Sequence, residues 1–232
     1  MKGKLLNTGL ILTIVGNLLG IMITAMMLWA DQEASLFKYN ITGKKNLILL
    51  NCPILLNGNE EREIKVKLKN NRDKVMSPFI RAYVSEEHIT LTRESTHELI
   101  IQPGDAAEII WKIYPEDAVY HRFVFFRIYI HDDYPYPTRD GTCGVWVTNI
   151  PGLSGNQLFL IFFTFSILLI VGGNILIQIA PHPLYDKRKI TAGMKYLSGL
   201  VLFNFIIAFL GYWVPGFIVL TLIVVLGIAL IV

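Results

Sequence analysis

The sequence has 232 residues, of which 53% are hydrophobic and 17% are charged, and its formal net charge is +3. A soluble domain has about 25% charged residues, so this composition favours a membrane protein. The apolar residues gather near the two ends of the chain, and the middle has an ordinary composition. Two cysteines and five histidines exclude a cysteine-rich secreted scaffold and a cysteine-based zinc or iron–sulfur centre.

The first predicted transmembrane helix covers residues 9–30 and follows a short segment, 1–8. No residue in 9–30 is charged, and a helix of this length, at about 1.5 Å per residue, spans a hydrocarbon core of about 30 Å. A cleaved signal peptide is the alternative, because Lys2 and Lys4 give a basic start. The apolar run is long for a signal peptide and no A-x-A motif precedes Asp31, so we expect an uncleaved anchor.

Residues 31–154 are expected to form an all-β domain. Apolar and charged residues alternate without exception from Glu63 to Lys69, which is typical of a half-buried strand. Turn-forming pairs such as Asn57-Gly58 and Asp140-Gly141 separate the strand candidates. The other predicted strands are 46–50, 78–84, 89–92, 98–101, 107–114, 122–130 and 143–148. Short strands at this spacing predict an antiparallel sandwich.

The predicted strand 122–130 has two different faces. One face is continuously apolar and is expected to line the core; it consists of Val124, Phe126, Ile128 and Ile130. The other face is a candidate partner surface together with two tyrosines of the next loop; its residues are Phe123, Phe125, Arg127, Tyr129, Tyr134 and Tyr136. We expect a loop to cover this aromatic face, and a bound partner is the alternative.

Several segments of the middle region follow one another in a pattern that resembles a known domain. These are Val66–Asn71, the Pro-Gly turn within Leu99–Asp105, the strand Ile109–Ile113 and the strand 122–130. Together, over about residues 62–131, they look like the immunoglobulin-like domains of prokaryotic cell-surface proteins. The resemblance implies an immunoglobulin-like sandwich with a binding or spacing role.

Cys52 and Cys143 are the only cysteines of the chain. Both fall in the predicted outside domain, where oxidising conditions permit a disulfide that closes a long loop. Two buried free thiols are the alternative. We predict a disulfide between Cys52 and Cys143.

The acidic segment His131-Asp132-Asp133, with Asp140, could supply oxygen ligands for a hard cation. It lacks the regular alternation of a calcium-binding loop, so a solvated acidic loop is expected instead. The sequence has no nucleophile elbow and no glycine-rich phosphate loop. We therefore expect no metal site, no cofactor and no enzymatic activity.

The C-terminal third predicts three further transmembrane helices, over residues 157–180, 197–213 and 216–232. A basic cytoplasmic loop, 181–196, is expected between the first two, and Pro215-Gly216 is expected to break the long apolar run.

The positive charges indicate an orientation. Segments 1–8 and 181–196 together carry 6 basic residues and 1 acidic residue, and residues 31–154 carry the remaining 15 basic and 17 acidic residues. Short basic segments lie on the cytoplasmic side of a membrane, so both termini are expected to be cytoplasmic, with residues 31–154 outside. The basic charge thus reports topology, and no nucleic-acid partner is expected.

The predicted spans contain no acidic, basic or histidine residue, which disfavours an ion or proton pathway. Their small and amide residues are expected to pack helices against one another; these residues are Gly16, Asn17, Gly20, Gly172, Gly173, Asn174 and Asn204. The three asparagines lie at similar distances from flanking lysines. We expect them in one layer, with at least two sharing hydrogen bonds.

These inferences predict a multi-pass cell-membrane protein with four transmembrane α-helices and one extracytoplasmic all-β immunoglobulin-like sandwich. We expect a non-enzymatic accessory or scaffolding subunit that contacts lipid and other membrane-protein subunits. A stand-alone surface receptor or adhesin that binds an external ligand is the alternative. A glycine or aromatic face that the chain's own bundle leaves unused would favour the accessory subunit.

Overall fold

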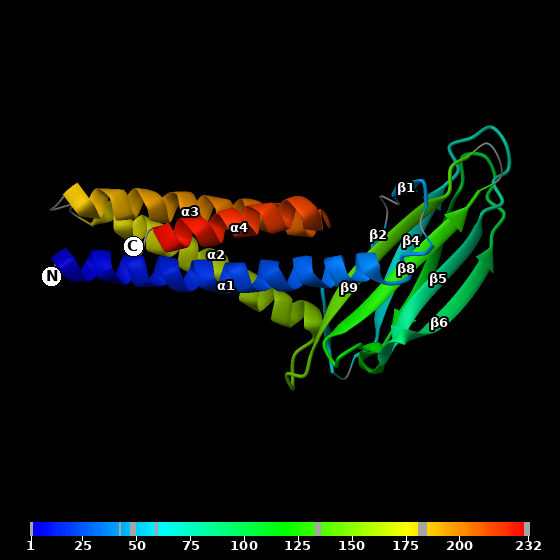
Figure 1. Ribbon diagram of the computed structural model, residues 1–232, viewed down its shortest axis with the longest axis horizontal. Coiled ribbons are helices and arrows are strands. Elements are labelled where there is room, and N and C mark those ends of the chain that lie inside the picture. The colour runs from blue at the N-terminus through cyan, green and yellow to red at the C-terminus, as the bar shows by residue number, and fades with distance from the viewer. Residues whose placement is uncertain are drawn as a thin grey trace. The chain divides into compact units, whose positions relative to one another are not determined.

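The computed structural model describes residues 2–41, 43–46, 50–58, 60–132, 136–180 and 185–229. The chain forms two compact units, and each is described by itself (Figure 1). The helical unit contains residues 1–28 and 159–232, and the sheet unit contains residues 29–158.

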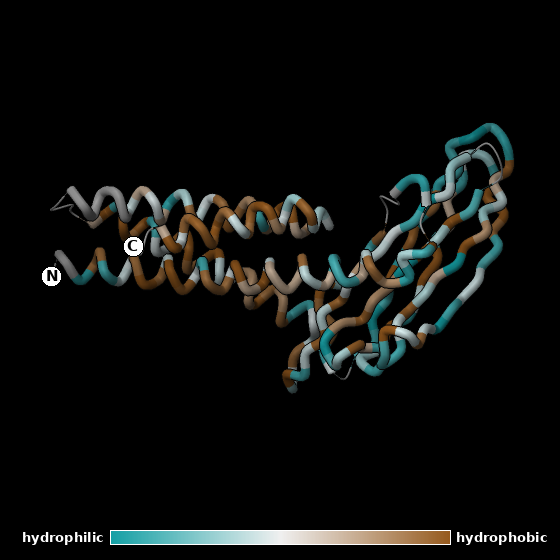
Figure 2. Tube along the Cα trace, viewed as in Figure 1, coloured by the Kyte–Doolittle hydropathy of each residue, from teal (hydrophilic) through white to brown (hydrophobic). Residues whose placement is uncertain are grey.

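The helical unit is built from four helices: α1 (Lys2–Leu36), α2 (Gly155–Ile179), α3 (Tyr185–Phe209) and α4 (Trp213–Ala229). Hydrophobic residues dominate these helices (Figure 2). Three of them contain stretches long and apolar enough to cross a membrane, and α4 is a shorter apolar helix. The chain therefore has the features of a membrane protein. A fourth span through α4 stays a prediction.

Two helices extend beyond their predicted ends. α1 continues to Leu36, because the segment after Ala30 contains neither glycine nor proline. α3 begins at Tyr185, so most of the expected loop 181–196 is helical. Lysine and arginine are good helix formers, and a basic segment beside a span can simply continue the helix.

The break between α3 and α4 lies at residues 210–212 and not at the expected Pro215-Gly216. Gly211 has a φ of 71°, a left-handed conformation that glycine adopts freely after a helix. Pro215 lies in the first turn of α4, where the missing N–H leaves no helical hydrogen bond unmade. Gly216 permits a close approach, since a Cβ there would lie 2.3 Å from Cδ2 of Leu28.

The sheet unit contains two sheets (Figure 1). The larger has the strand order β1-β9-β8-β5-β6, with β3 also paired to β9, and the smaller has the order β2-β4-β7. The strands are β1 (Lys45–Asn46), β2 (Leu50–Asn51), β3 (Leu55–Asn57), β4 (Arg62–Lys69), β5 (Phe79–Glu86), β6 (His88–Glu98), β7 (Ala106–Ile113), β8 (Phe123–His131) and β9 (Arg139–Thr148). A 3-10 turn, η1 (Pro115–Asp117), precedes β8.

One hydrophobic core lies between the two sheets. The alternation predicted for β4 is present, with Ile64, Val66 and Leu68 buried. In β8, the apolar face 124, 126, 128 and 130 faces this core, which is the register expected from the sequence. Trp111 of β7 meets Phe126 with ring centroids 5.3 Å apart. The two sheets thus pack as the layers of a sandwich.

The sheet unit differs from the predicted antiparallel sandwich in its pairing. β1 and β3 both pair with β9 in parallel, and the partners lie far apart in sequence, where no local pattern specifies them. Residues 98–101 form no separate strand, because β6 runs to Glu98 and Ile101 makes only an isolated bridge to Met76. The predicted strand 46–50 falls partly on 47–49, outside the described residues.

The two cysteines are joined by a disulfide. Cys52 precedes β3 and Cys143 lies in β9, with their Cα atoms 6.5 Å apart and 91 positions apart in sequence. The bridge therefore ties the start of the sheet unit to its last strand.

Candidate functional site

The expected partner surface on β8 is covered by the chain itself. Phe125 is fully buried and Phe123 is nearly so, and Phe37, which follows α1, contacts Phe125 with ring centroids 6.0 Å apart. The face is thus covered, as expected, but by the end of α1 and the turn that begins at Phe37 and not by a separate loop. It is not available as a partner site, because Phe123 and Phe125 are buried within the chain.

Arg127 fixes this covering segment to the sheet. Its side chain is only 3% exposed, and Nη1 donates to the carbonyl oxygens of Phe37 at 2.9 Å and Ser35 at 3.3 Å. Nη2 donates to Asp140 at 2.7 Å. A cation at a helix C-terminus satisfies carbonyls that have no partner within the helix.

A glycine of β9 allows α1 to lie close to the sheet. A Cβ on Gly144 would lie 2.1 Å from the carbonyl oxygen of Ala30, and the Gly144 N–H donates to Asp31 at 3.3 Å. The sequence contained a sign of this contact, since buried Ala30, Ala34 and Phe37 recur at helical spacing beyond the predicted span.

The three tyrosines of the candidate surface differ in position. Tyr129 is half-buried, and Tyr134 lies outside the described residues. Tyr136 is exposed and stacks on Arg72, with the guanidinium carbon 3.3 Å from the ring centroid. They form no common surface in the part of the chain that the structure describes.

A polar cluster lies inside the helical unit. Asn17 of α1 and Asn174 of α2 both donate to the hydroxyl of Ser198 on α3, at 3.1 Å and 3.2 Å. We call these three residues the amide cluster. Its location agrees with the sequence estimate that placed Asn17 and Asn174 at one depth, whereas Ser198 was not anticipated. A hydroxyl can accept two amide protons, which explains why serine completes the cluster.

Asn204 does not join the amide cluster. It lies six residues beyond Ser198 on α3, or about 9 Å along the helix axis. Its side chain is fully buried, and neither its amide nitrogen nor its amide oxygen has a hydrogen-bond partner. The amide oxygens of Asn17 and Asn174 are also unpaired. The helical unit thus holds unused hydrogen-bonding capacity.

Glycines set how closely the helices approach. A Cβ on Gly16, Gly20 or Gly173 would meet an atom of a neighbouring helix within 3 Å. Gly172 was expected to pack in the same way, yet a Cβ there would meet nothing within 4 Å. Adjacent helical residues point about 100° apart, so only one glycine of the pair can face the neighbouring helix. Gly199, beside the amide cluster, is open as well.

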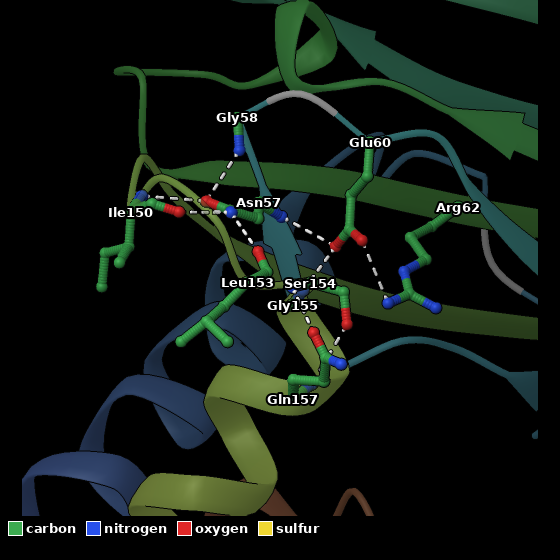
Figure 3. A network of polar contacts seen from close by, with 9 residues as sticks. All are labelled: Asn57, Gly58, Glu60, Arg62, Ile150, Leu153, Ser154, Gly155 and Gln157. Atoms are coloured by element: carbon green, nitrogen blue, oxygen red, sulfur yellow. Dashed lines mark hydrogen bonds and ion pairs between the residues drawn. The ribbon is translucent and has the colours of Figure 1, made fainter.

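A second polar network precedes α2 (Figure 3). The Glu60 carboxylate accepts the backbone N–H groups of Asn57 and Gly155, at 3.0 Å and 2.7 Å, and pairs with Arg62 at 3.1 Å. Burial acts to raise the pKa of Glu60, but these hydrogen bonds and Arg62 outweigh it and hold the pKa below its usual value. A carboxylate at a helix N-terminus is also favoured by the helix dipole.

Asn57 holds the loop that leads into α2. Its amide nitrogen donates to the carbonyl oxygens of Ile150 and Leu153, and its amide oxygen accepts the N–H of Ile150 at 2.9 Å (Figure 3). Ser154 and Gln157 exchange hydrogen bonds across the first turn, which is a capping box. This network fixes the start of α2.

No cluster of three or more metal-binding side chains occurs among the described residues. The acidic segment considered from the sequence is occupied by arginines: Asp132 pairs with Arg72 and Arg139, at 2.8 Å and 3.1 Å, and Asp140 pairs with Arg127. Asp133 lies outside the described residues. These ion pairs use the carboxylates that a cation would need.

Comparisons with known proteins identify no family. No family model matches the sequence, and no curated protein does. Among solved structures, a Paenibacillus cycloisomaltooligosaccharide glucanotransferase has a TM-score of 0.31 at 6% identity, over 48% of this chain and 15% of that chain. A β-glucosidase from Listeria innocua has a TM-score of 0.30 at 15% identity, over 43% of this chain and 15% of that chain. The chain thus spans only a small part of these proteins.

Proposed function

We propose that this protein is a non-enzymatic accessory or scaffolding subunit of a larger membrane complex, with a sheet unit of immunoglobulin-like type on the outer side. The observation that carries the proposal is the pair of open glycines, Gly172 and Gly199, on the helical unit. The unpaired amides inside the unit add to it.

An amide without a partner is costly where no water is present. The Asn204 amide and the amide oxygens of Asn17 and Asn174 are all unpaired. The hydroxyls of Thr13 and Thr24 donate to carbonyl oxygens of their own helix, each at 2.9 Å. Asn17 and Asn204 are 1% and 0% exposed, so a helix from another subunit would supply the missing donors and acceptors only together with a rearrangement of the bundle.

Two open glycines lie at the level of the amide cluster. Asn174 bonds to Ser198, so Gly172 on α2 and Gly199 on α3 are at similar heights. Neither has an atom within 4 Å of the position of a Cβ. Glycine in a membrane helix is characteristic of close helix contacts, and these two glycines serve none within the described chain. This is the property that distinguishes an accessory subunit from a solitary receptor.

The covered β8 face also favours the accessory subunit. The aromatic side chains that a receptor could have offered to a ligand, Phe123 and Phe125, pack against the chain itself. The helical unit, in contrast, leaves Gly172 and Gly199 open.

Site-specific photocrosslinking tests the proposal. A photoreactive phenylalanine at position 199, in membranes of the native host, is expected to crosslink to a second membrane protein. The matched control is position 218, since Ile218 of α4 is exposed and is not one of the open glycines. The variant Gly199→Leu should weaken the association by about tenfold, or ~1.4 kcal/mol. The fold of the variant should be unaffected, because a Cβ at position 199 meets no atom within 4 Å.

Equal crosslinking at positions 199 and 218, or products with lipid alone, would contradict the proposal. A Gly199→Leu variant that keeps its full yield of the crosslinked complex would do so as well.

A further inference from the structure

We infer that one end of the sheet unit contacts lipid headgroups through the turn 119–122 and the loop 149–154. The residues concerned are Tyr120, His121, Arg122, Ile150 and Leu153, and we call them the headgroup surface. The inference goes beyond the proposed function and requires only that α2 crosses a membrane.

The turn 119–122 exposes an aromatic and a basic side chain. Tyr120 and His121 have φ values of 56° and 55°, the left-handed conformation of a tight hairpin turn, which histidine adopts fairly often and tyrosine rarely. The Arg122 N–H closes the turn on the Val119 carbonyl at 3.1 Å. Tyr120 is 66% exposed. The closed turn thus holds the exposed Tyr120 side chain at a fixed place on this end of the sheet.

The loop 149–154 lies at the same end of the sheet as this turn. The Val147 N–H donates to the carbonyl oxygen of Arg122 at 2.6 Å, and Phe123 pairs with Trp146. Ile150 and Leu153 are 38% and 37% exposed, and their side chains extend away from the polar contacts of Asn57 (Figure 3). Because Asn57 binds the backbone of both, the loop presents these apolar side chains in a fixed arrangement.

The chain itself places this loop near a membrane. Leu153 precedes the first residue of α2 by two positions, and the apolar part of α2 begins at Leu158. A two-residue extended link and one helical turn reach at most about 12 Å. The polar headgroup region on each side of the hydrocarbon core is roughly 5 to 8 Å thick. Leu153 therefore lies in or directly beside the headgroup region when α2 spans.

The headgroup surface has the chemistry of a membrane interface. Tyrosine is enriched at this depth because its ring is apolar and its hydroxyl is polar. Arg122 and His121 are exposed, and Arg122 forms no ion pair with any residue in the described part of the chain, so its guanidinium is free to bind a lipid phosphate. The apolar Ile150 and Leu153 favour shallow insertion between headgroups.

Quenching of a fluorescent probe by lipid tests the inference on the full-length protein in nanodiscs. The two native cysteines are bridged, so a single introduced cysteine can carry an environment-sensitive NBD label under non-reducing conditions. The test position is His121→Cys, and the matched control is Ile100→Cys, which is 77% exposed. Ile100 follows the opposite end of the sheet, where Glu98, Phe79 and His131 lie opposite one another. A label at Leu168→Cys, on the exposed side of α2, reports whether this helix is inserted in the bilayer.

We expect phosphatidylcholine with a headgroup nitroxide to quench the label at 121 severalfold more than the label at 100. A Tyr120→Ser, Arg122→Gln double variant should reduce the quenching of a label at Ile150→Cys. Equal and weak quenching at positions 121 and 100, together with strong quenching at position 168 by a nitroxide on the lipid acyl chain, would overturn the inference. The turn 119–122 would then be assigned to contact with a protein partner. Loss of quenching at 168 would show instead that α2 is not inserted, which also removes the premise.

Discussion

The sheet unit and the helical unit satisfy their buried polar side chains in different ways. In the sheet unit, long charged side chains from distant strands meet: Arg127 reaches Asp140 and the end of α1, and Arg93 reaches Asp117 at 2.8 Å. The helical unit has no charged side chain in its apolar stretches. Its short amides reach the hydroxyl of Ser198 and, from Asn174, the carbonyl oxygen of Ile170 at 2.8 Å, and Asn204 reaches nothing.

This difference shows that the amino-acid composition of a unit determines how its buried polar side chains can find hydrogen-bond partners. A water-facing domain can use arginine to connect elements far apart, because arginine has five donors on a long stem. An apolar helix must rely on close glycine contacts and on short polar side chains. Buried polar atoms without a partner occur in both units, among them Nε of Arg127 and Oδ1 of Asp132 in the sheet unit. The difference is that these two side chains still make other hydrogen bonds, whereas the Asn204 amide makes none. The predictions below test the two halves of this comparison.

The largest effect is expected from removing the disulfide. A Cys52→Ala, Cys143→Ala variant should lower the free energy of unfolding of the sheet unit by about 4 to 5 kcal/mol, because the bridge closes a long loop in the unfolded chain. Denaturant titration of the full-length protein in nanodiscs, followed by tryptophan fluorescence, measures this. The helical content should remain. A change below about 1 kcal/mol would mean that the unfolded sheet unit is already compact.

A smaller loss is expected when the lock on α1 is broken. Arg127→Met leaves Asp140 and the carbonyls of Ser35 and Phe37 without their cation, and should cost about 3 kcal/mol. The matched control is Arg81→Met, since that side chain is 49% exposed and its ion pair with Glu94 is long at 4.0 Å. This control should change stability by less than about 1 kcal/mol. Similar losses in both variants would refute a special role of Arg127.

The helical unit should respond in opposite directions to two leucine substitutions. Asn17→Leu removes a hydrogen bond to Ser198 and should destabilise the isolated protein by about 1 kcal/mol. Asn204→Leu removes only unpaired groups and should be neutral or stabilising in the isolated protein. In native membranes, Asn204→Leu should lower the yield of the crosslinked complex. Thermal unfolding in detergent gives the first comparison, and equal destabilisation by both variants would contradict it.

The smallest effect concerns Glu60 and pH. Because the folded pKa of Glu60 is lowered, its contribution to stability is present above the ordinary glutamate range and is lost as the pH falls through the folded pKa. The difference in Tm between the native protein and Glu60→Gln should therefore shrink on going from neutral to acidic pH. Glu98→Gln, at an exposed position, is the control. A Tm difference that stays constant with pH would assign the effect of Glu60 to packing alone.

Much of the sheet unit could be predicted because its information is local. The alternation in β4 specified which residues are buried, and the two faces of β8 specified its register. The parallel partners of β9 could not be predicted, since β1 and β3 lie far from it in sequence. The covering of Phe125 was expected, but by a loop and not by the end of α1, because the apolar run appeared to end at Ala30, although helical spacing continued to Phe37.

The candidate polar site was predictable only in part. Depth along a helix follows from counting residues, which brought Asn17 and Asn174 together. Orientation around a helix depends on neighbours whose packing the sequence does not specify, so Gly172 and Gly173 could not be told apart. Ser198 was overlooked because a single hydroxyl in an apolar run is common, and its importance comes from the two amides that meet there.

The bridge between Cys52 and Cys143 also determines what a protease can achieve. Any single cut between those residues opens the loop but leaves the two fragments covalently joined. One fragment carries α1 and the other carries α2 and the helices that follow. A nicked molecule would therefore migrate as one species until it is reduced.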